Sequence, residues 1–309
     1  MNNIIAVKKS TDLKSSLLAP GHRACAGCGQ MIAARLVADA LGPNTIIANA
    51  TGCLEVVTTA YPESSWGLPW IHSLFENAPA IASGIYAALK SQGKDKQIKV
   101  VAQGGDGGTF DIGFGLISGM WERSENILYV CYDNEGYMNT GAQASAATPW
   151  AANTTTTPAG ASPELAGIGS HFMKKDMLAI ALAHGLKYVA QTTVAYPLDI
   201  VKKVKQAIAT PGPSYLQILV PCIPGWKIEP NQTIELAKLA VTSGIYPAVE
   251  FVNGLPGDMM KLPAQRPPVE NYLKPQGRFK HLFKDERGKE QIAYIQKLAD
   301  LNVKKYNLS

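Results

Sequence analysis

The sequence predicts a doubly wound α/β domain with a mostly parallel sheet. Short apolar runs alternate with amphipathic segments of helical period, Gly or Pro separates the segments, and several apolar runs end in Gly, Asp, Asn or Cys. Buried parallel strands form such continuous apolar runs, and helices must connect them. We expect this domain at residues 21–225, preceded by a polar arm at 1–20. An extended C-terminal arm at 226–309, in which prolines recur, is expected to make subunit contacts.

Composition narrows the classes of protein. With 309 residues, 46% of them hydrophobic, the chain can bury a sizeable core. It has no uninterrupted run of about 18 apolar residues and no signal-peptide pattern, so no membrane partner is expected. The net charge of +5 comes without an aromatic-interleaved basic stripe, so no nucleic acid is expected either. Five irregularly spaced cysteines do not suggest a disulfide scaffold, and the expected location is cytoplasmic.

The first half of the domain is expected to begin with a glycine-rich loop at residues 22–29. Apolar residues at helical spacing then predict helices at 31–41 and 78–90, each followed by a glycine stop. A short apolar run at 45–50 predicts a strand. This strand leads directly into Gly52 and Cys53.

The second half continues the alternation. Strands at 98–102 and 127–132 are joined by a helix at 109–123, as a crossover between parallel strands requires. Residues 134–170 show little periodicity, and a loop of that length suggests a functional role. The remaining expected elements are a helix at 176–184, a strand at 186–191, a helix at 197–210, a strand at 214–220 and a charged helix near 286–306.

Two of these strands end in residues suited to a metal-bound diphosphate. One strand runs into Gly105-Asp106-Gly107 and the next into Asp133-Asn134. Parallel sheets bind phosphate-bearing ligands at such strand ends, and glycines let the backbone approach the phosphates. Mg²⁺ prefers six oxygen ligands. Asp106, Asn134 and a backbone carbonyl near Gly136 could supply three of them.

A simpler interpretation of Gly-Asp-Gly is a turn after a strand, and alone this motif would favour it. A second strand that ends in Asp133-Asn134 makes the simple turn less favoured. The 26 residues between Gly107 and Asn134 place both residues at one edge of the sheet. The pair therefore favours a diphosphate site.

The cysteines suggest a second site. Four of them fall in expected loops, two directly after strands at the same sheet edge: Cys25, Cys28, Cys53 and Cys222. Four thiolates can hold a [4Fe–4S] cluster. Zinc usually takes two CxxC knuckles, and only one is present, whereas a redox disulfide would not explain the two dispersed cysteines. Cys131 lies within an expected strand and is interpreted as a core residue.

These motifs resemble those of a known family. The Gly-Asp-Gly…Asn pair resembles the thiamine-diphosphate motif, and nearly the whole chain resembles the β subunit of 2-oxoacid:ferredoxin oxidoreductases, closer to the pyruvate-type branch than to the 2-oxoglutarate type. The resemblance is carried by residues 21–29, 50–53, 105–107, 137–141, 147–149, 154–158 and 221–222.

The resemblance implies a sheet of the thiamine-diphosphate-binding type and oxidative decarboxylation of a small 2-oxoacid, with electrons leaving through the cluster to ferredoxin. Coenzyme A would be a co-substrate in a pyruvate-type enzyme. The implied Mg²⁺ ligands are Asp106, Asn134 and the Gly136 carbonyl, and the implied cluster ligands are Cys25, Cys28, Cys53 and Cys222. Further cofactor contacts fall on Gly52, Gly105, Gly107, Asn139 and Thr140, with Asn139 as the candidate catalytic residue of the pocket.

The resemblance also implies partner chains. In this superfamily a glutamate from a different module activates the cofactor, and no second module is found here. The expected partners are an α subunit and γ and δ or fused subunits of the same complex, and one of these chains is expected to supply the glutamate. Glu55 and Glu76 are less favoured local alternatives.

Departures from the family pattern concern the substrate. Ala144 replaces a polar or basic residue, Gly136 replaces a bulkier one, and 160–169 lacks an expected lysine-glycine pattern. These changes flank the expected pocket and leave oxalate as an alternative to pyruvate. Two other functions stay open: a non-redox thiamine-dependent decarboxylase with structural zinc, and a non-catalytic assembly subunit, which the intact metal ligands disfavour.

Overall fold

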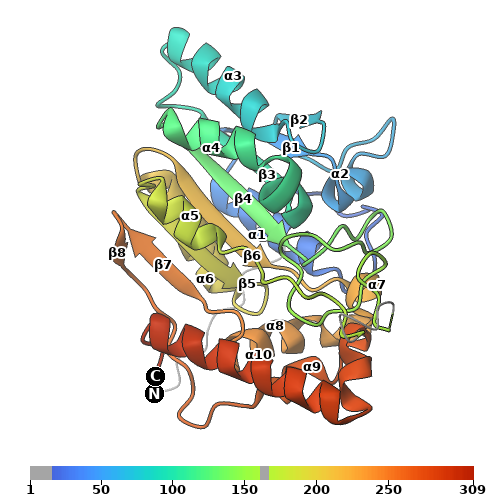
Figure 1. The fold of residues 1–309 in the computed structure, drawn as a ribbon. Coiled ribbons are helices and arrows are strands. Elements are labelled where there is room, and N and C mark those ends of the chain that lie inside the picture. The colour runs from blue at the N-terminus through green and yellow to red at the C-terminus, as the bar shows by residue number, and fades with distance from the viewer. Residues whose placement is uncertain (1–15, 161–166) are drawn as a thin grey trace, which may run out of the picture.

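The computed structural model describes residues 16–160 and 167–309, and its described residues are built around one eight-stranded sheet (Figure 1). The strand order is β2-β1-β3-β4-β6-β5-β7-β8. Pairs from β2 through β5 are parallel, whereas β7 and β8 join antiparallel at one edge. The strands are β1 (Thr45–Ala50), β2 (Trp70–Ser73), β3 (Lys99–Gly105), β4 (Ile127–Asp133), β5 (Tyr188–Thr193), β6 (Ser214–Leu219), β7 (Val249–Val252) and β8 (Leu255–Pro256). The predicted doubly wound, mostly parallel fold is confirmed.

Helices cover both faces of this sheet. Buried residues of α1 and α6 pack on one face, and those of α3, α4 and α5 pack on the other (Figure 1). The helices are α1 (Gly29–Leu41), α2 (Cys53–Thr58), α3 (Ala78–Ser91), α4 (Phe114–Glu122), α5 (Met177–Ala183), α6 (Pro197–Ala209), α7 (Ile223–Trp226), α8 (Thr233–Thr242), α9 (Val269–Leu273) and α10 (Glu286–Lys305). A π-helix η2 (Gly107–Ile112) and 3₁₀-helices η3 (Pro230–Gln232) and η4 (Gly277–Phe283) complete them.

Local sequence signals explain most of these elements. Asp176 caps α5 by accepting a hydrogen bond from the Ala179 N–H at 2.9 Å, and Pro197 occupies the first turn of α6. All seven residues of β4 are buried, as its apolar run predicts. The expected helix at 109–123 is instead divided at Gly113 into η2 and α4. A Cβ at Gly113 would lie 2.1 Å from the Gly108 carbonyl oxygen, so only glycine permits this junction.

Two elements near the site, α2 and β2, were not predicted. Between the strand at 45–50 and the helix at 78–90, the sequence pattern predicts no helix or strand. In the structure Cys53 begins α2, and Trp70–Ser73 pairs with β1 as a parallel edge strand. Both are short, and the surrounding prolines and tryptophans obscure their periodicity.

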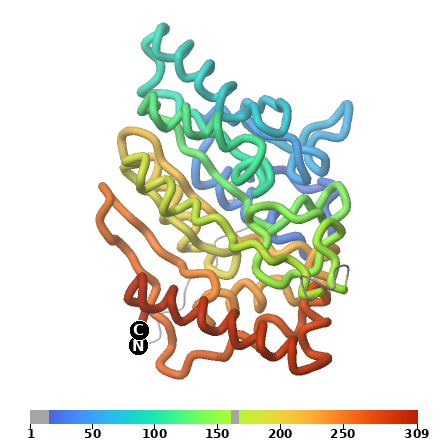
Figure 2. Tube along the Cα trace, viewed as in Figure 1, coloured from blue at the N-terminus to red at the C-terminus, as the bar shows by residue number. Residues whose placement is uncertain are grey.

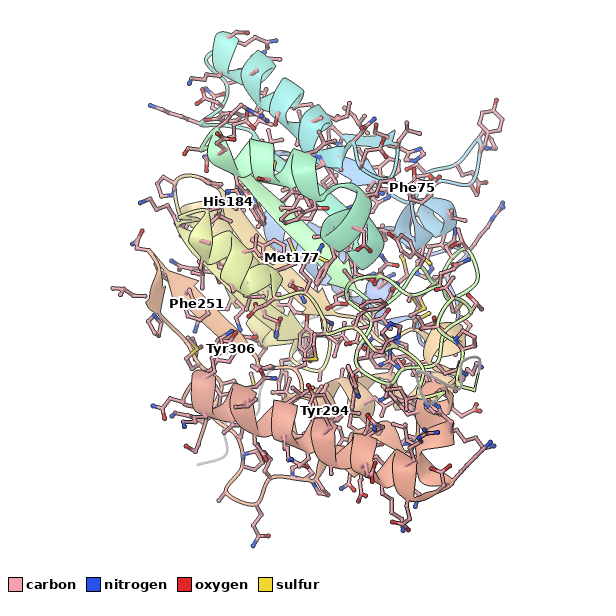
Figure 3. The ribbon with its side chains drawn as sticks, viewed as in Figure 1. Phe75, Met177, His184, Phe251, Tyr294 and Tyr306 are labelled. Atoms are coloured by element: carbon pink, nitrogen blue, oxygen red, sulfur yellow. The ribbon has the colours of Figure 1, made fainter. Side chains whose placement is uncertain are left out.

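The C-terminal segment packs on its own domain in this single chain. It adds β7 and β8 to the sheet, and its helices α8, α9 and α10 share a buried cluster that includes Trp226 and Tyr272. At the end of α10 the Tyr306 ring meets Phe251 of β7, with centroids 6.1 Å apart (Figure 3). The two strands were not predicted, and contacts of this segment with other subunits stay a prediction.

The predicted N-terminal arm is only partly described, since residues 1–15 lie outside the described residues. Leu18 is fully buried and forms an antiparallel bridge with Trp66. Asp39 on α1 accepts a hydrogen bond from the Leu17 N–H at 2.7 Å. The end of the arm therefore packs against the domain. None of the helices in the described ranges is both long and apolar enough to span a membrane.

The long connection between β4 and α5 lies where the strands end. Its described part, 134–160 and 167–176, contains turns and isolated bridges but no helix or strand. Figure 2 shows this green segment between the blue N-terminal loops and the orange and red C-terminal segment. Asn153 donates its N–H to the Arg278 carbonyl at 2.9 Å, so the connection is bound to the C-terminal segment.

Candidate functional site

Three oxygen atoms of Asp106, Asn134 and Gly136 converge at the ends of β3 and β4. The Asn134 Oδ1 stands 2.8 Å from Asp106 Oδ1 and 2.8 Å from the Gly136 carbonyl oxygen. Neighbouring oxygens around an octahedral Mg²⁺, at about 2.1 Å from the metal, stand about 3 Å apart. Without a cation, the amide turned by 180° would donate its NH₂ to both oxygens instead. The arrangement therefore fits a small divalent cation.

Asp106 is a buried carboxylate with few donors to neutralise it. Its side chain is 1% exposed and accepts hydrogen bonds from the Asn134 N–H at 3.2 Å and from Ser145 Oγ at 2.5 Å. Burial, followed by the nearby charge of Asp133, raises the pKa of Asp106 to about 8. A cation at the oxygen cluster would stabilise the ionised form, so the electrostatics also fit a metal site.

The glycines around Asp106 do different things. A Cβ at Gly52 or Gly105 would meet nothing within 4 Å, so both border open space at the strand ends. A Cβ at Gly107 would lie 2.2 Å from the Tyr137 ring, and one at Gly108 would lie 2.8 Å from the Phe75 carbonyl oxygen. Gly52 and Gly105 therefore leave open space beside the strand ends, whereas Gly107 and Gly108 permit tight packing.

Asn139 and Thr140 lie on an exposed turn after Gly136. Thr140 Oγ1 donates to Gln143 Oε1 at 2.6 Å, and Tyr137 and Gln143 form a bridge across the turn. A Cβ at Gly136 would lie 2.9 Å from the Gln143 carbonyl oxygen, which explains why this position holds no bulkier residue. The structure thus places Asn139 and Thr140 next to the oxygen cluster in sequence but outside it.

The four predicted cluster cysteines come from three segments that contact one another. The Cys28 N–H donates to the Cys25 carbonyl at 3.1 Å, which closes the CxxC turn. Thr233 Oγ1 donates to the Gly27 carbonyl at 2.7 Å and thereby binds this turn to the segment after Cys222. Cys53 begins α2 and Cys222 immediately precedes α7.

These four thiols are also in electrostatic contact. All are free. Burial raises the pKa of Cys53 to about 12, and the next contributions come from Cys222, Cys28 and Cys25. Burial likewise raises the pKa of Cys222 to about 12, with Cys28 and Cys25 adding to it. Four free thiols at one sheet edge match in number and type the donors that a [4Fe–4S] cluster requires.

The thiols do not form a compact site for a single ion. Across residues 16–160 and 167–309, no group of three or more His, Cys, Asp or Glu side chains is arranged to hold one metal ion. Cys131 is fully buried inside β4, so its predicted core role is confirmed.

A buried ionic network lies behind the oxygen cluster, and sequence reasoning missed it. Lys174 Nζ donates to Asp133 at 2.6 Å and to Glu135 at 2.9 Å, and Arg278 donates to Glu135 at 2.6 Å. Burial pushes the pKa of Glu135 upward, but the charges of Lys174 and Arg278 outweigh it and lower that pKa. Burial, joined by the nearby charge of Glu135, raises the pKa of Asp133 despite the opposing charge of Lys174.

Trp226 connects the two predicted sites. Its fully buried indole donates Nε1–H to the Asn134 carbonyl at 2.8 Å, and its backbone N–H donates to the Cys222 carbonyl at 2.9 Å. Because Trp226 stands only four residues after the predicted ligand Cys222, the sequence could have marked it as a residue near the predicted cysteine site. Ser145, Lys174 and Arg278 offer no comparable local signal, because each reaches the site from a distant segment.

A comparison with known families places this site in a class. The family model described as "Thiamine pyrophosphate enzyme, C-terminal TPP binding domain" matches residues 50–218, which contain the oxygen cluster. The protein is thus a thiamine-pyrophosphate enzyme of this domain type, and the predicted sheet type is confirmed.

Comparison with individual proteins identifies the family within this class of enzymes. The chain is 51% identical over 288 residues to pyruvate synthase subunit PorB of Methanosarcina barkeri, covering 93% of this chain and 96% of that one. It is 52% identical over 293 residues to PorB of Methanocaldococcus jannaschii, covering 93% and 95%. A solved 2-oxoglutarate:ferredoxin oxidoreductase from Magnetococcus marinus shares the fold, with a TM-score of 0.58 and 21% identity over 94% of this chain and 99% of that one. The chain therefore belongs to the β subunits of the 2-oxoacid:ferredoxin oxidoreductases, as its motifs predicted.

Proposed function

We propose that this β subunit serves an enzyme that oxidatively decarboxylates pyruvate, binds thiamine diphosphate through Mg²⁺, and passes electrons through a [4Fe–4S] cluster to ferredoxin. The observation that carries the proposal is the oxygen cluster of Asp106, Asn134 and Gly136, whose 2.8 Å separations suit one octahedral cation. Thiamine diphosphate would supply the ability to stabilise negative charge on a substrate carbon.

The residues of this chain then have distinct tasks. Asp106, Asn134 and the Gly136 carbonyl would hold the Mg²⁺, while open space beside Gly52 and Gly105 would admit the diphosphate. Asn139, and Thr140 beside it, would contact the cofactor once a partner chain covers their turn. Cys25, Cys28, Cys53 and Cys222 would ligate the cluster.

The site is incomplete in one chain. We infer that an α subunit supplies the activating glutamate and that further γ and δ or fused subunits complete the complex. Glu55 is a poor substitute, since its carboxylate lies 3.9 Å from His72 on β2 and its helix begins at a proposed cluster ligand. The cytoplasm, where thiols stay reduced, suits four free cysteines.

The substrate assignment rests on the relatives. Identity of 51–52% to subunits named pyruvate synthase supports pyruvate, with coenzyme A as co-substrate, over the oxalate alternative. Ala144, one basis for that alternative, donates its N–H to Thr156 Oγ1 at 2.9 Å and serves the local turn.

The test is an anaerobic preparation of the complete complex. We expect bound thiamine diphosphate and about four irons per β chain. Viologen reduction should be fastest with pyruvate plus coenzyme A, compared with oxalate, 2-oxobutyrate and 2-oxoglutarate, each with and without coenzyme A. A colourless preparation that contains zinc would refute the electron-transfer role and favour the non-redox decarboxylase. Unchanged turnover after Asp106→Ala would favour a non-catalytic subunit.

A further inference from the structure

We propose that Arg278 is a positioning residue for the Mg²⁺ site: it holds residues 133–136, the ligand loop, in the conformation that brings Asn134 and Gly136 to Asp106. The proposal rests on the proposed function, because the ligand roles belong to it. Arg278 lies on η4 in the C-terminal segment, far along the chain from the ligand loop.

The ligand loop has a conformation that needs support. Glu135 stands between the two ligands with φ of 67°, in the left-handed region. For a residue other than glycine this region costs roughly 1–2 kcal/mol. The φ angle of Glu135 also sets the relative direction of the Asn134 side chain and the Gly136 carbonyl, so relaxation of this residue would separate the two ligands.

The side chain of Glu135 is clamped on both oxygens. Arg278 donates to Oε2 at 2.6 Å and Lys174 donates to Oε1 at 2.9 Å. Both members of the Arg278–Glu135 pair are almost fully buried, with side chains 2% and 3% exposed. Charge-assisted hydrogen bonds in such surroundings are strong, and removing one partner leaves an unpaired buried charge.

Arg278 reaches the ligand loop by a second route. Its guanidinium carbon lies 3.9 Å from the centroid of the Trp226 ring, and Trp226 donates to the Asn134 carbonyl at 2.8 Å. Gln276 Oε1 accepts from Arg278 Nε at 2.8 Å and fixes the orientation of the planar group. A lysine would supply the charge but neither the planar stack nor the fork of donors.

The charges of the network favour a cation at the oxygen cluster. Lys174 and Arg278 balance Asp133 and Glu135 through direct contacts, and among residues 16–160 and 167–309 the hydrogen-bond donors to Asp106 are Ser145 and one backbone N–H alone. One uncompensated carboxylate therefore remains, and it faces the Asn134 and Gly136 oxygens. Arg278 acts on the metal only through Glu135 and Trp226.

The experiment uses the complete anaerobic complex with three changes in the β chain. Arg278→Met removes the contact of Arg278 with Glu135 and leaves the Glu135 carboxylate without that partner. The double variant Glu135→Gln, Arg278→Met removes the same contact but also neutralises Glu135. Arg266→Met is the matched control, since Arg266 pairs with Asp300 in the same C-terminal segment. The measured quantity is the Mg²⁺ concentration at half-maximal thiamine diphosphate binding, by equilibrium dialysis, together with iron content and Tm.

We expect Arg278→Met to raise the half-saturating Mg²⁺ about 10-fold or more, as loss of an outer-shell partner does in other metal sites. The double variant should have a higher Tm than Arg278→Met and should keep its iron. It should still need about 10-fold more Mg²⁺ than the wild-type chain for half-maximal cofactor binding. Arg266→Met should match the wild-type chain. If Arg278→Met fails to assemble, the double variant carries the test alone.

A wild-type Mg²⁺ requirement in the double variant overturns the proposal, because positioning would then not depend on Arg278. Asp106→Asn separates this result from the proposed function. If Asp106→Asn loses cofactor binding while the Arg278 variants bind cofactor at the wild-type Mg²⁺ concentration, the metal site stands and only the role of Arg278 is wrong. If Asp106→Asn binds normally, the metal site and this proposal both fail.

Discussion

Replacing Gly27 by alanine should displace the CxxC turn and remove the cluster. Gly27 lies between Cys25 and Cys28 with φ of 75°, and an added Cβ would stand 2.3 Å from the Pro230 carbonyl oxygen. Ordinary contact begins at 3.4 Å, so the turn and η3 must separate by about 1.1 Å. Displacing two of four thiols by that distance should prevent stable cluster assembly, because the ligand set would no longer converge.

Gly42→Ala is the matched control. Gly42 follows α1 with φ of 80°, and a Cβ there would meet nothing within 4 Å. Both positions have a positive φ that favours glycine, and Gly42 with ψ of 172° is the more restricted backbone, but only Gly27→Ala also has a collision.

The assay is iron content with low-temperature EPR of the reduced, anaerobic complex. Gly42→Ala should retain about four irons per β chain, whereas Gly27→Ala should retain less than about half of them. Full iron and an unchanged EPR signal in Gly27→Ala would refute the reasoning. Loss of iron in both variants would assign the effect to general strain.

Three further predictions concern separate parts of the chain. Asp106→Asn should raise the Mg²⁺ needed for thiamine diphosphate binding at least about 10-fold, as loss of a charged ligand should, and calorimetric titration that finds no shift would count against the oxygen cluster. Burial raises the pKa of Glu250, whose Oε2 has no hydrogen-bond partner in the part of the chain that the structure describes, so the folded chain binds this proton more tightly than the unfolded one. Its stability contribution is complete below the unfolded pKa and is lost as pH rises toward the folded pKa. Glu250→Gln should therefore raise Tm at pH 8 but not at pH 4, and an equal change at both pH values would contradict this. Ile200→Ala, at a fully buried position of α6, should cost about 2–5 kcal/mol in denaturant unfolding. Leu198→Ala, 84% exposed on the same helix, should cost almost nothing, and similar costs would show that α6 does not pack as described.

The fold was predictable because its signals are local. The first strand has the predicted bounds, Thr45–Ala50, since a continuous apolar run before a glycine-containing turn has few alternatives. The strands β3 and β4 were predictable for the same reason, although β3 continues to Gly105, three residues beyond the predicted end at 102, and β4 continues one residue beyond 132. Parallel pairing then brings Asp106 and Asn134 together without any further information. Their convergence was therefore implied once both strands were assigned.

The rest of the site was not predictable from local pattern. Ser145 reaches Asp106 from a loop without periodicity, and Arg278 reaches Glu135 across 143 residues of sequence. Neither the spacing nor the residue type of these groups reveals the contact, because tertiary packing creates it. The antiparallel strand β7 was not predicted for a related reason. It is only four residues long, and its pairing with β5 defines it, not a pattern in its own sequence.

The short helix α7 lies between the proposed cluster site and the proposed Mg²⁺ site, so binding at one site would affect binding at the other. Cys222 immediately precedes α7, and Trp226 at its end donates to the Asn134 carbonyl, so one four-residue element supports both sites. Linkage requires that if cluster insertion strengthens thiamine diphosphate binding by some factor, cofactor binding strengthens retention of the cluster by the same factor. Equal cofactor dissociation constants in cluster-free and cluster-loaded complexes would refute such coupling. With coupling, a β chain that loses its cluster to oxygen would bind its cofactor more weakly by that same factor, and subunits that hold only one of the two groups would be less populated at equilibrium.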